Sequence, residues 1–97
     1  MENTRNLSCP VVHLNGSGFE NLKNQYHAAY VAIQEAEEVL RGSAPHSRDF
    51  YVLENGPERF AAASAEHVER LTKLRIIQDE LVQLVESLYD QQSARKK

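Results

Sequence analysis

Residues 57–91 read PERFAAASAEHVERLTKLRIIQDELVQLVESLYDQ, and this stretch decides the fold. Positions suited to a buried stripe recur in it every three or four residues, the spacing of one face of an α-helix. They are Phe60, Ala63, His67, Leu71, Leu74, Ile77, Leu81, Leu84, Val85 and Leu88. Pro57 suits the first helical position, and Glu58 complements the dipole at the helix N-terminus. The stretch predicts a helix over 57–91, roughly 50 Å long at 1.5 Å per residue.

A second, shorter helix is predicted before it, over residues 18–41. Its face consists of Leu22, Tyr26, Ala29, Ile33, Ala36 and Leu40. Ser17 and Glu20 have the spacing of a capping box, in which the hydroxyl accepts from a backbone N–H and the carboxylate reaches back. Gly42 and then Pro45 indicate where this helix ends.

The two helices are joined by residues 42–56, a long connection for two packed helices. Connections of this length tend to be functional or disordered, and the aromatic content favours order. Folding the helices back on each other predicts an all-α, antiparallel two-helix hairpin. The expected facing pairs are Leu40 with Phe60, Ile33 with His67, Tyr26 with Leu74, and Phe19 with Leu81.

The two ends of the chain are simpler. Residues 1–10 lack periodicity and are expected to be a flexible terminus, while 11–14 form a short extended segment that meets the overhanging end of the second helix. The hairpin domain then covers 11–92. Residues 93–97 are expected to form a solubilising basic tail.

Two helices cannot enclose a core by themselves. Five further apolar residues lie outside the main stripes and widen them: Val31, Val39, Val68, Ile76 and Val82. A second apolar flank is what an interface between copies requires. We therefore expect a homo-oligomer.

Composition excludes several classes of protein. The net charge of −3 argues against general DNA or RNA binding, which needs a basic face. No apolar run approaches the roughly 20 residues that span a bilayer. Cys9 is the only cysteine and no signal peptide precedes it, which favours a reducing cytoplasm. No metal-ligand spacing or strained nucleophile turn is found, so neither a metal or cofactor nor an enzyme is expected.

The first candidate binding residues are His13, Asn15 and Ser17, at the turn before the first helix. Unpaired N–H groups at a helix N-terminus attract a phosphate or carboxylate, and the side chains add donors. The alternative is an ordinary capping turn.

The second group lies in the linker and comprises Arg48, Asp49, Phe50 and Tyr51. Arg48 offers a planar fork for phosphate, the aromatic rings can stack on a base, and Asp49 can accept from a ribose hydroxyl or a base amine. The alternative is an Arg48–Asp49 ion pair that pins the loop, with the aromatic rings covering the hairpin end.

The third group is His67 and Arg70, one turn apart on the second helix. Because a buried arginine needs a partner, Arg70 is expected to meet Asp49, Glu37 or a ligand anion. His67 alternatively is a hydrogen-bonded core residue.

These residues resemble a group of small, mostly uncharacterised proteins of tailed phages and prophages. That group has a His-Leu-Asn-Gly-Thr opening, a Pro-x-x-Arg-Asp-Tyr-Tyr loop, and Glu-His followed by Arg on the second helix. Residues 13–17, 45–51 and 66–70 match these elements, and the resemblance spans about residues 11–90. Ser17 replaces the usual Thr, and Phe50 replaces a Tyr, which removes a hydroxyl.

The size and helical character are also similar to phage sponges that counter CBASS and Thoeris immunity. The resemblance implies a phage protein, in the cytoplasm of a host bacterium, that sequesters a cyclic nucleotide or cyclic ADP-ribose signal without turnover. Shared architecture is an analogy and does not establish activity. The alternative is a helical interaction module that inhibits or adapts a host protein.

Overall fold

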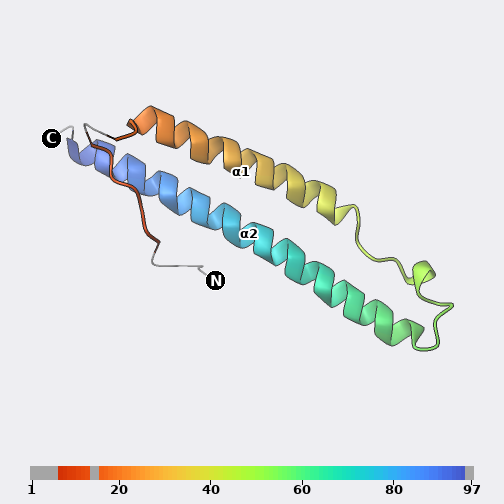
Figure 1. The fold of residues 1–97 in the computed structure, drawn as a ribbon. Helices are drawn as coiled ribbons and strands as arrows, with labels where there is room; N and C mark the ends of the chain where they lie inside the picture. Colours follow the sequence, from red (N-terminus) through yellow and green to blue (C-terminus); the bar gives the residue numbers. More distant parts are fainter. Residues whose placement is uncertain (1–6, 14–15, 96–97) are drawn as a thin grey trace.

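The computed structural model describes residues 7–13 and 16–95, and it is an antiparallel helical hairpin (Figure 1). Helix α1 spans Phe19–Arg41, a 3₁₀ helix η1 spans Ser47–Asp49, and helix α2 spans Gly56–Arg95. The described residues contain no strand. The predicted all-α hairpin is confirmed. Helix α2 runs four residues beyond the predicted end at 91, so residues 93–95 continue the helix instead of starting a tail.

Helix α1 begins without the predicted capping box. Gly18 is the N-cap, in an extended conformation, and no side chain caps the helix. Ser17 therefore lies one residue too early to accept from the first turn. Glu20 pairs instead with Lys23, at 3.0 Å, and this contact raises the pKa of the Lys23 amine. At the other end Gly42 caps the helix, donating its N–H to the Val39 oxygen at 3.0 Å.

The alignment of the two helices differs from the predicted pairing. Phe19 was expected to face Leu81, but its ring packs edge-on against Tyr89, with the centroids 5.2 Å apart. Tyr89 lies eight residues further along α2, which is about two helical turns. The predicted facing pairs are therefore wrong by at least that distance.

The linker explains this displacement. It does not reverse direction at the end of α1; it runs on alongside the start of α2 (Figure 1). The ring of Phe50 packs against that of Phe60, with centroids 5.9 Å apart. The first turns of α2 are thus covered by the linker, and α1 is left to pack further along α2.

The extended segment before α1 lies against the last turns of α2 (Figure 1). The Gln91 amide holds it at two points: its Nε2 donates to the Pro10 oxygen at 3.0 Å, and its Oε1 accepts from the Val12 N–H at 2.9 Å. This confirms the expected contact between residues 11–14 and the end of α2, as far as Val12. It also shows that Pro10, assigned to the flexible terminus, is fixed.

The apolar interior is thin. Leu88 is the only hydrophobic side chain buried among the described residues; the other buried side chains are Glu37, His67 and Gln78. The radius of gyration is 19.5 Å, against about 12.5 Å for a compact chain of this length. The molecule measures 66 × 22 × 18 Å. Within the described residues, neither helix has the length and apolarity needed to cross a membrane.

Candidate functional site

The linker presents three of its four candidate residues to solvent. Arg48, Asp49 and Tyr51 are exposed, and 75% of Tyr51 is accessible. The backbone around them is ordered by His46, whose Nδ1 accepts from the Arg48 N–H at 3.1 Å and whose carbonyl accepts from the Asp49 N–H at 3.0 Å. These two hydrogen bonds fix the loop backbone from which the exposed side chains extend.

The structure separates the two interpretations of the linker. Among the described residues, no hydrogen bond or ion pair joins the side chains of Arg48 and Asp49, so the loop is not pinned by that pair. Phe50, in contrast, is half-buried against Phe60 and covers the hairpin end. Arg48, Asp49 and Tyr51 remain available to a ligand, and Phe50 acts as an anchor.

Gly56 explains how the linker closes onto α2. It is buried, and a Cβ at this position would lie 2.6 Å from the Phe50 carbonyl oxygen. Real Cβ atoms do not approach a backbone oxygen so closely. The first residue of α2 is a glycine because the loop backbone passes directly over it.

His67 is buried, and its Nε2 has no hydrogen-bond partner within the described residues. It lies between two inter-segment contacts of α2, those of Phe60 with Phe50 and of Arg75 with Glu37. The segment opposite His67 is therefore the end of α1 and the start of the linker. The structure thus brings His67 to the loop end of the hairpin.

This position corrects two sequence-based predictions. His67 does not face Ile33, and a hydrogen-bonded core histidine is not what the structure shows. Arg70 is exposed and lies 3.9 Å from Glu66 on its own helix. Arg70 needs no buried anion, because it is not buried, and the carboxylate of Glu37 is taken by other residues.

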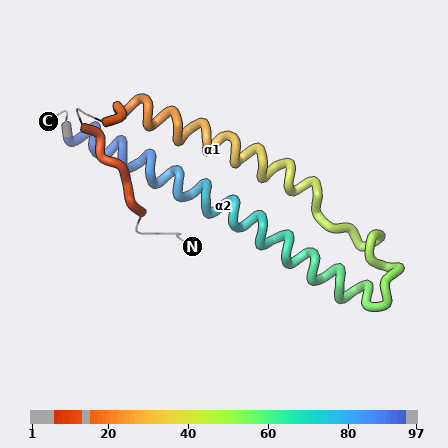
Figure 2. Tube along the Cα trace, in the orientation of Figure 1, coloured from red at the N-terminus to blue at the C-terminus, as the bar shows by residue number. Residues whose placement is uncertain are grey.

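The described residues of the candidate turn, 13, 16 and 17, lie at the opposite end of the molecule from the linker (Figure 2). His13 and Ser17 are exposed, and Asn15 lies outside the described residues. The Gly16 N–H donates to the His13 oxygen at 3.2 Å, and the imidazole lies against Gly16, where a Cβ would be 2.5 Å from Nε2. Within one chain, this turn and the linker cannot touch the same small ligand.

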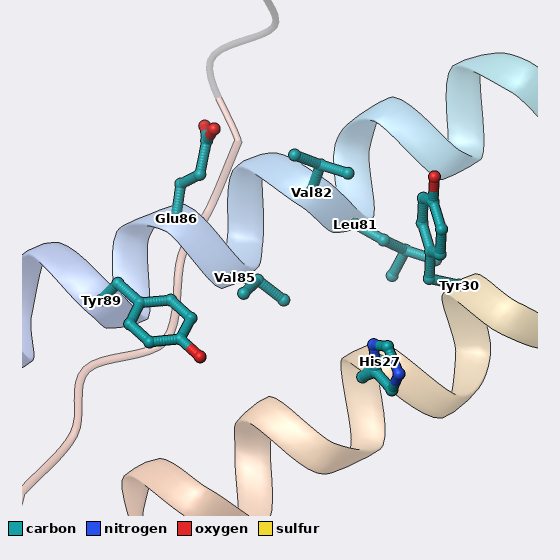
Figure 3. A pocket seen from close by; sticks show the side chains of 7 residues that line it. All are labelled: His27, Tyr30, Leu81, Val82, Val85, Glu86 and Tyr89. Atoms are coloured by element: carbon teal, nitrogen blue, oxygen red, sulfur yellow. The ribbon is translucent and has the colours of Figure 1, made fainter.

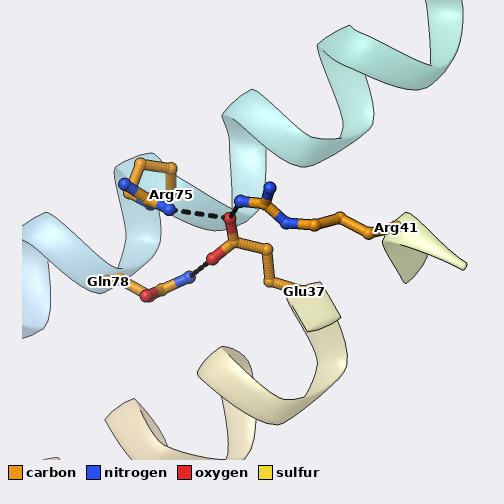
Figure 4. A network of polar contacts seen from close by, with 4 residues as sticks. All are labelled: Glu37, Arg41, Arg75 and Gln78. Atoms are coloured by element: carbon orange, nitrogen blue, oxygen red, sulfur yellow. Dashed lines mark hydrogen bonds and ion pairs between the residues drawn. The ribbon is translucent and has the colours of Figure 1, made fainter. Parts of the chain in front are cut away.

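A polar cluster that sequence analysis missed joins the two helices around Glu37 (Figure 4). Glu37 is buried, and its carboxylate accepts from Gln78 at 2.6 Å and from Arg75 at 2.8 Å, both across the hairpin, and from Arg41 one turn away. These hydrogen bonds, led by that from Gln78, lower the pKa of Glu37 to about 2. The i,i+4 spacing of Glu37 and Arg41 was visible in the sequence, but the partners on α2 depend on the helix alignment.

An apolar groove lies between the helices (Figure 3). It is near the end of the hairpin where α1 begins and α2 finishes, which we call the terminal end. Its volume is about 320 Å³, and it is lined by His27, Tyr30, Leu81, Val82, Val85, Glu86 and Tyr89. A second hollow of about 280 Å³ adjoins it and is lined partly by Lys23 and Asn24. Sequence analysis did not identify this groove, because the predicted facing pairs were displaced.

The described residues contain no group of three His, Cys, Asp or Glu side chains placed to hold a metal ion. In the comparisons with known proteins, the chain matches no family model, no curated protein and no solved structure.

Proposed function

We propose that this protein is a non-catalytic binding protein of phage origin that, as an assembly of its own copies, sequesters a nucleotide-derived immune signal such as a cyclic nucleotide or cyclic ADP-ribose. The observation that supports it is the linker. An ordered loop presents Arg48, Asp49 and Tyr51, and none of these side chains has a hydrogen-bond or ion-pair partner among residues 7–13 and 16–95.

The chemistry of that set suits a phosphorylated nucleoside. A guanidinium holds two phosphate oxygens in a fork, an exposed phenol ring stacks on a base, and a carboxylate accepts from a hydroxyl or an amine. A single hairpin is only 22 × 18 Å in cross-section, whereas binding sites enclose most of a small ligand. Enclosure therefore requires a second copy beside the loop, which is why the proposal includes self-association.

Isothermal titration of the protein with cyclic dinucleotides, cyclic trinucleotides and cyclic ADP-ribose isomers tests this. One class is expected to bind, and to be recovered unchanged after the protein is denatured by heat. Arg48→Ala should weaken that binding about 10- to 100-fold through loss of a charged hydrogen-bonding partner. Arg59→Ala is the matched control, because Arg59 is also exposed and lies in the first turns of α2. Absence of binding across the panel would refute the proposal, as would equal losses in the two variants.

A second candidate function is a helical module that docks a host protein. It is favoured by isolated apolar side chains far outside the hairpin core, of which Val39 is 77% exposed. Val39→Glu should then abolish capture of one defined host protein while leaving the helices intact. If Val39→Glu leaves capture of that protein unchanged, this docking surface is excluded.

A further inference from the structure

One face of α2 repeats every seven residues across most of its length. Val68, Arg75, Val82 and Tyr89 follow this spacing, which puts residues on one side of a helix with a drift of about 20° per repeat. Val68 is 60% exposed, Val82 41% and Tyr89 49%, and the Arg75 side chain is half exposed. We call these four residues the heptad stripe. It is an apolar stripe with a single charge at Arg75.

Arg75 lies at the middle of α2. Gly56 precedes it by 19 residues and Arg95 follows it by 20, distances of about 28 and 30 Å at 1.5 Å per residue. Val68 and Val82 lie seven residues to either side of Arg75. A two-fold axis at Arg75 therefore brings Val68 of one copy to Val82 of the other, and Tyr89 to Ala61, so that one surface meets itself.

We propose that a second copy of this chain packs antiparallel along the heptad stripe, with the two-fold axis at Arg75, to form a four-helix bundle. This inference rests on the proposed function only for its consequence at the ligand site. In this arrangement Val68 of each copy meets the other copy at Val82, beside the apolar groove. The groove of about 320 Å³ thereby receives an exposed side chain of the partner.

The charges around the axis agree with this packing. Arg75 shares a shallow hollow of about 400 Å³ with Arg41 and with the exposed carboxylates Glu35 and Glu38. The two-fold axis brings the Arg75 side chains of the two copies near each other, and the carboxylates in this hollow offset that repulsion. Arg75 is oriented beforehand by the buried Glu37, at 2.8 Å.

The exposed area also fits a second copy. The chain has an accessible surface of 7341 Å², against about 5,600 Å² for a compact monomer of 11.0 kDa. The excess for two chains is about 3,500 Å², within the range of obligate homodimer interfaces, about 2,000 to 5,000 Å². Because Leu88 is the one hydrophobic side chain buried among the described residues, an interface of this size would add to a small core.

The arrangement has a consequence for ligand binding. When the α2 helices of the two copies overlap along their full length, the linker of one copy lies beside the terminal end of the other. Arg48 and Tyr51 of one chain then lie on the same level as His13 and Ser17 of its partner. Two candidate groups that are far apart in one hairpin come to the same end of the dimer.

Sedimentation of the full chain tests the surface. The wild-type protein is expected at twice its mass of 11.0 kDa. Val68→Glu and Val82→Glu should each raise the dimer dissociation constant about 100-fold, because each would place an unpaired charge in the interface. Val39→Glu is the control, because it adds the same charge to an exposed valine outside the stripe. Circular dichroism of each variant separates lost association from lost folding.

Cross-linking tests the direction, in a Cys9→Ser background that removes the only native thiol. An equimolar mixture of the Val68→Cys and Val82→Cys proteins should form a disulfide-linked dimer under mild oxidation. Neither protein alone should do so. Linking of Val68→Cys to itself would indicate parallel packing and would overturn the proposal.

The remaining outcomes are also decisive. A wild-type protein that sediments as a monomer would overturn the proposal and leave the groove to another partner. If Val39→Glu breaks the dimer and Val82→Glu does not, the interface lies on a different face and the proposal is wrong. Ligand titration is measured separately, so a confirmed dimer without ligand binding would refute the proposed function and leave this inference intact.

Discussion

The two ends of the hairpin are built differently. At the terminal end, Leu88 is fully buried, and the Gln91 amide ties the extended segment to α2. At the loop end, Arg48, Asp49 and Tyr51 are exposed, and the Nε2 of the buried His67 has no hydrogen-bond partner in the described part of the chain. The terminal end holds the buried leucine and the hydrogen bonds to the extended segment, while the loop end presents exposed polar side chains. This difference predicts that substitutions cost more stability at the terminal end than at the exposed linker residues.

Leu88→Ala should cause the largest loss of stability. Leu88 has no accessible surface, and removing a buried leucine side chain costs about 2 to 5 kcal/mol through lost transfer free energy and a new cavity. Urea denaturation at one fixed protein concentration measures the free energy of unfolding. Ile77→Ala, at a side chain that is 40% exposed, is the comparison and should cost clearly less. Equal losses would mean that the terminal end is not where the core lies.

Gly56→Ala should be the next largest change, at the loop end. Its Cβ would lie 2.6 Å from the Phe50 oxygen, and relieving such a clash with backbone costs about 1 to 3 kcal/mol. Gly18→Ala is a matched control, because a Cβ there meets nothing within 4 Å. Thermal unfolding of both variants provides the comparison. A Gly56→Ala protein as stable as Gly18→Ala would show that the linker does not pass over α2.

Lowering the pH should destabilise the fold at the middle of the molecule, where the Glu37 carboxylate is buried. The pKa of Glu37 is lowered from 4.5 to about 2 in the folded chain by its hydrogen bonds to Gln78, Arg75 and Arg41. A depressed pKa contributes stability that is present above pH 4.5 and is lost as the pH falls toward 2. Denaturation midpoints between pH 6 and pH 2 should therefore fall less steeply for Glu37→Gln than for the wild type. The exposed Glu38→Gln should follow the wild-type curve, and a Glu37→Gln curve parallel to it would contradict the assignment.

The smallest expected effect on stability is at the exposed linker residues. Arg48→Ala and Tyr51→Ala remove side chains that have no partner in the described chain, so unfolding free energies should stay within about 0.5 kcal/mol of wild type. The same denaturation assay measures this. A loss above about 1 kcal/mol would mean that these residues support the loop, and it would weaken their assignment to ligand binding.

The two helices could be predicted from the sequence, but the contacts between them could not. The apolar period predicted both helices, and Gly42 with Pro45 indicated the end of α1. The alignment of the helices was wrong, because the length of a linker does not reveal whether it reverses at once or follows the next helix. That alignment decides which residues meet: Gln78 and Arg75 with Glu37, and Tyr89 with Phe19.

Only part of the candidate site could be predicted, because the surroundings of its other residues depend on the helix alignment. Exposed Arg48 and Tyr51 follow from their place in a polar connection, and local spacing was sufficient to identify them. Phe50 could not be recognised as an anchor until its contact with Phe60 was known. Arg70 was assigned to a buried position because it lies beside the apolar stripe, but α1 does not reach that part of α2.

The sequence by itself determined the elements: two amphipathic helices, a chemically varied linker, and an extended segment that meets the end of α2. Periodicity and capping residues act over a few neighbouring positions, so they can be read locally. The tertiary structure alone decided the helix alignment, the polar cluster at Glu37, the burial of His67 and the groove beside Val82. Each of these depends on distances between residues far apart in the chain, which are fixed only when the linker packs along α2.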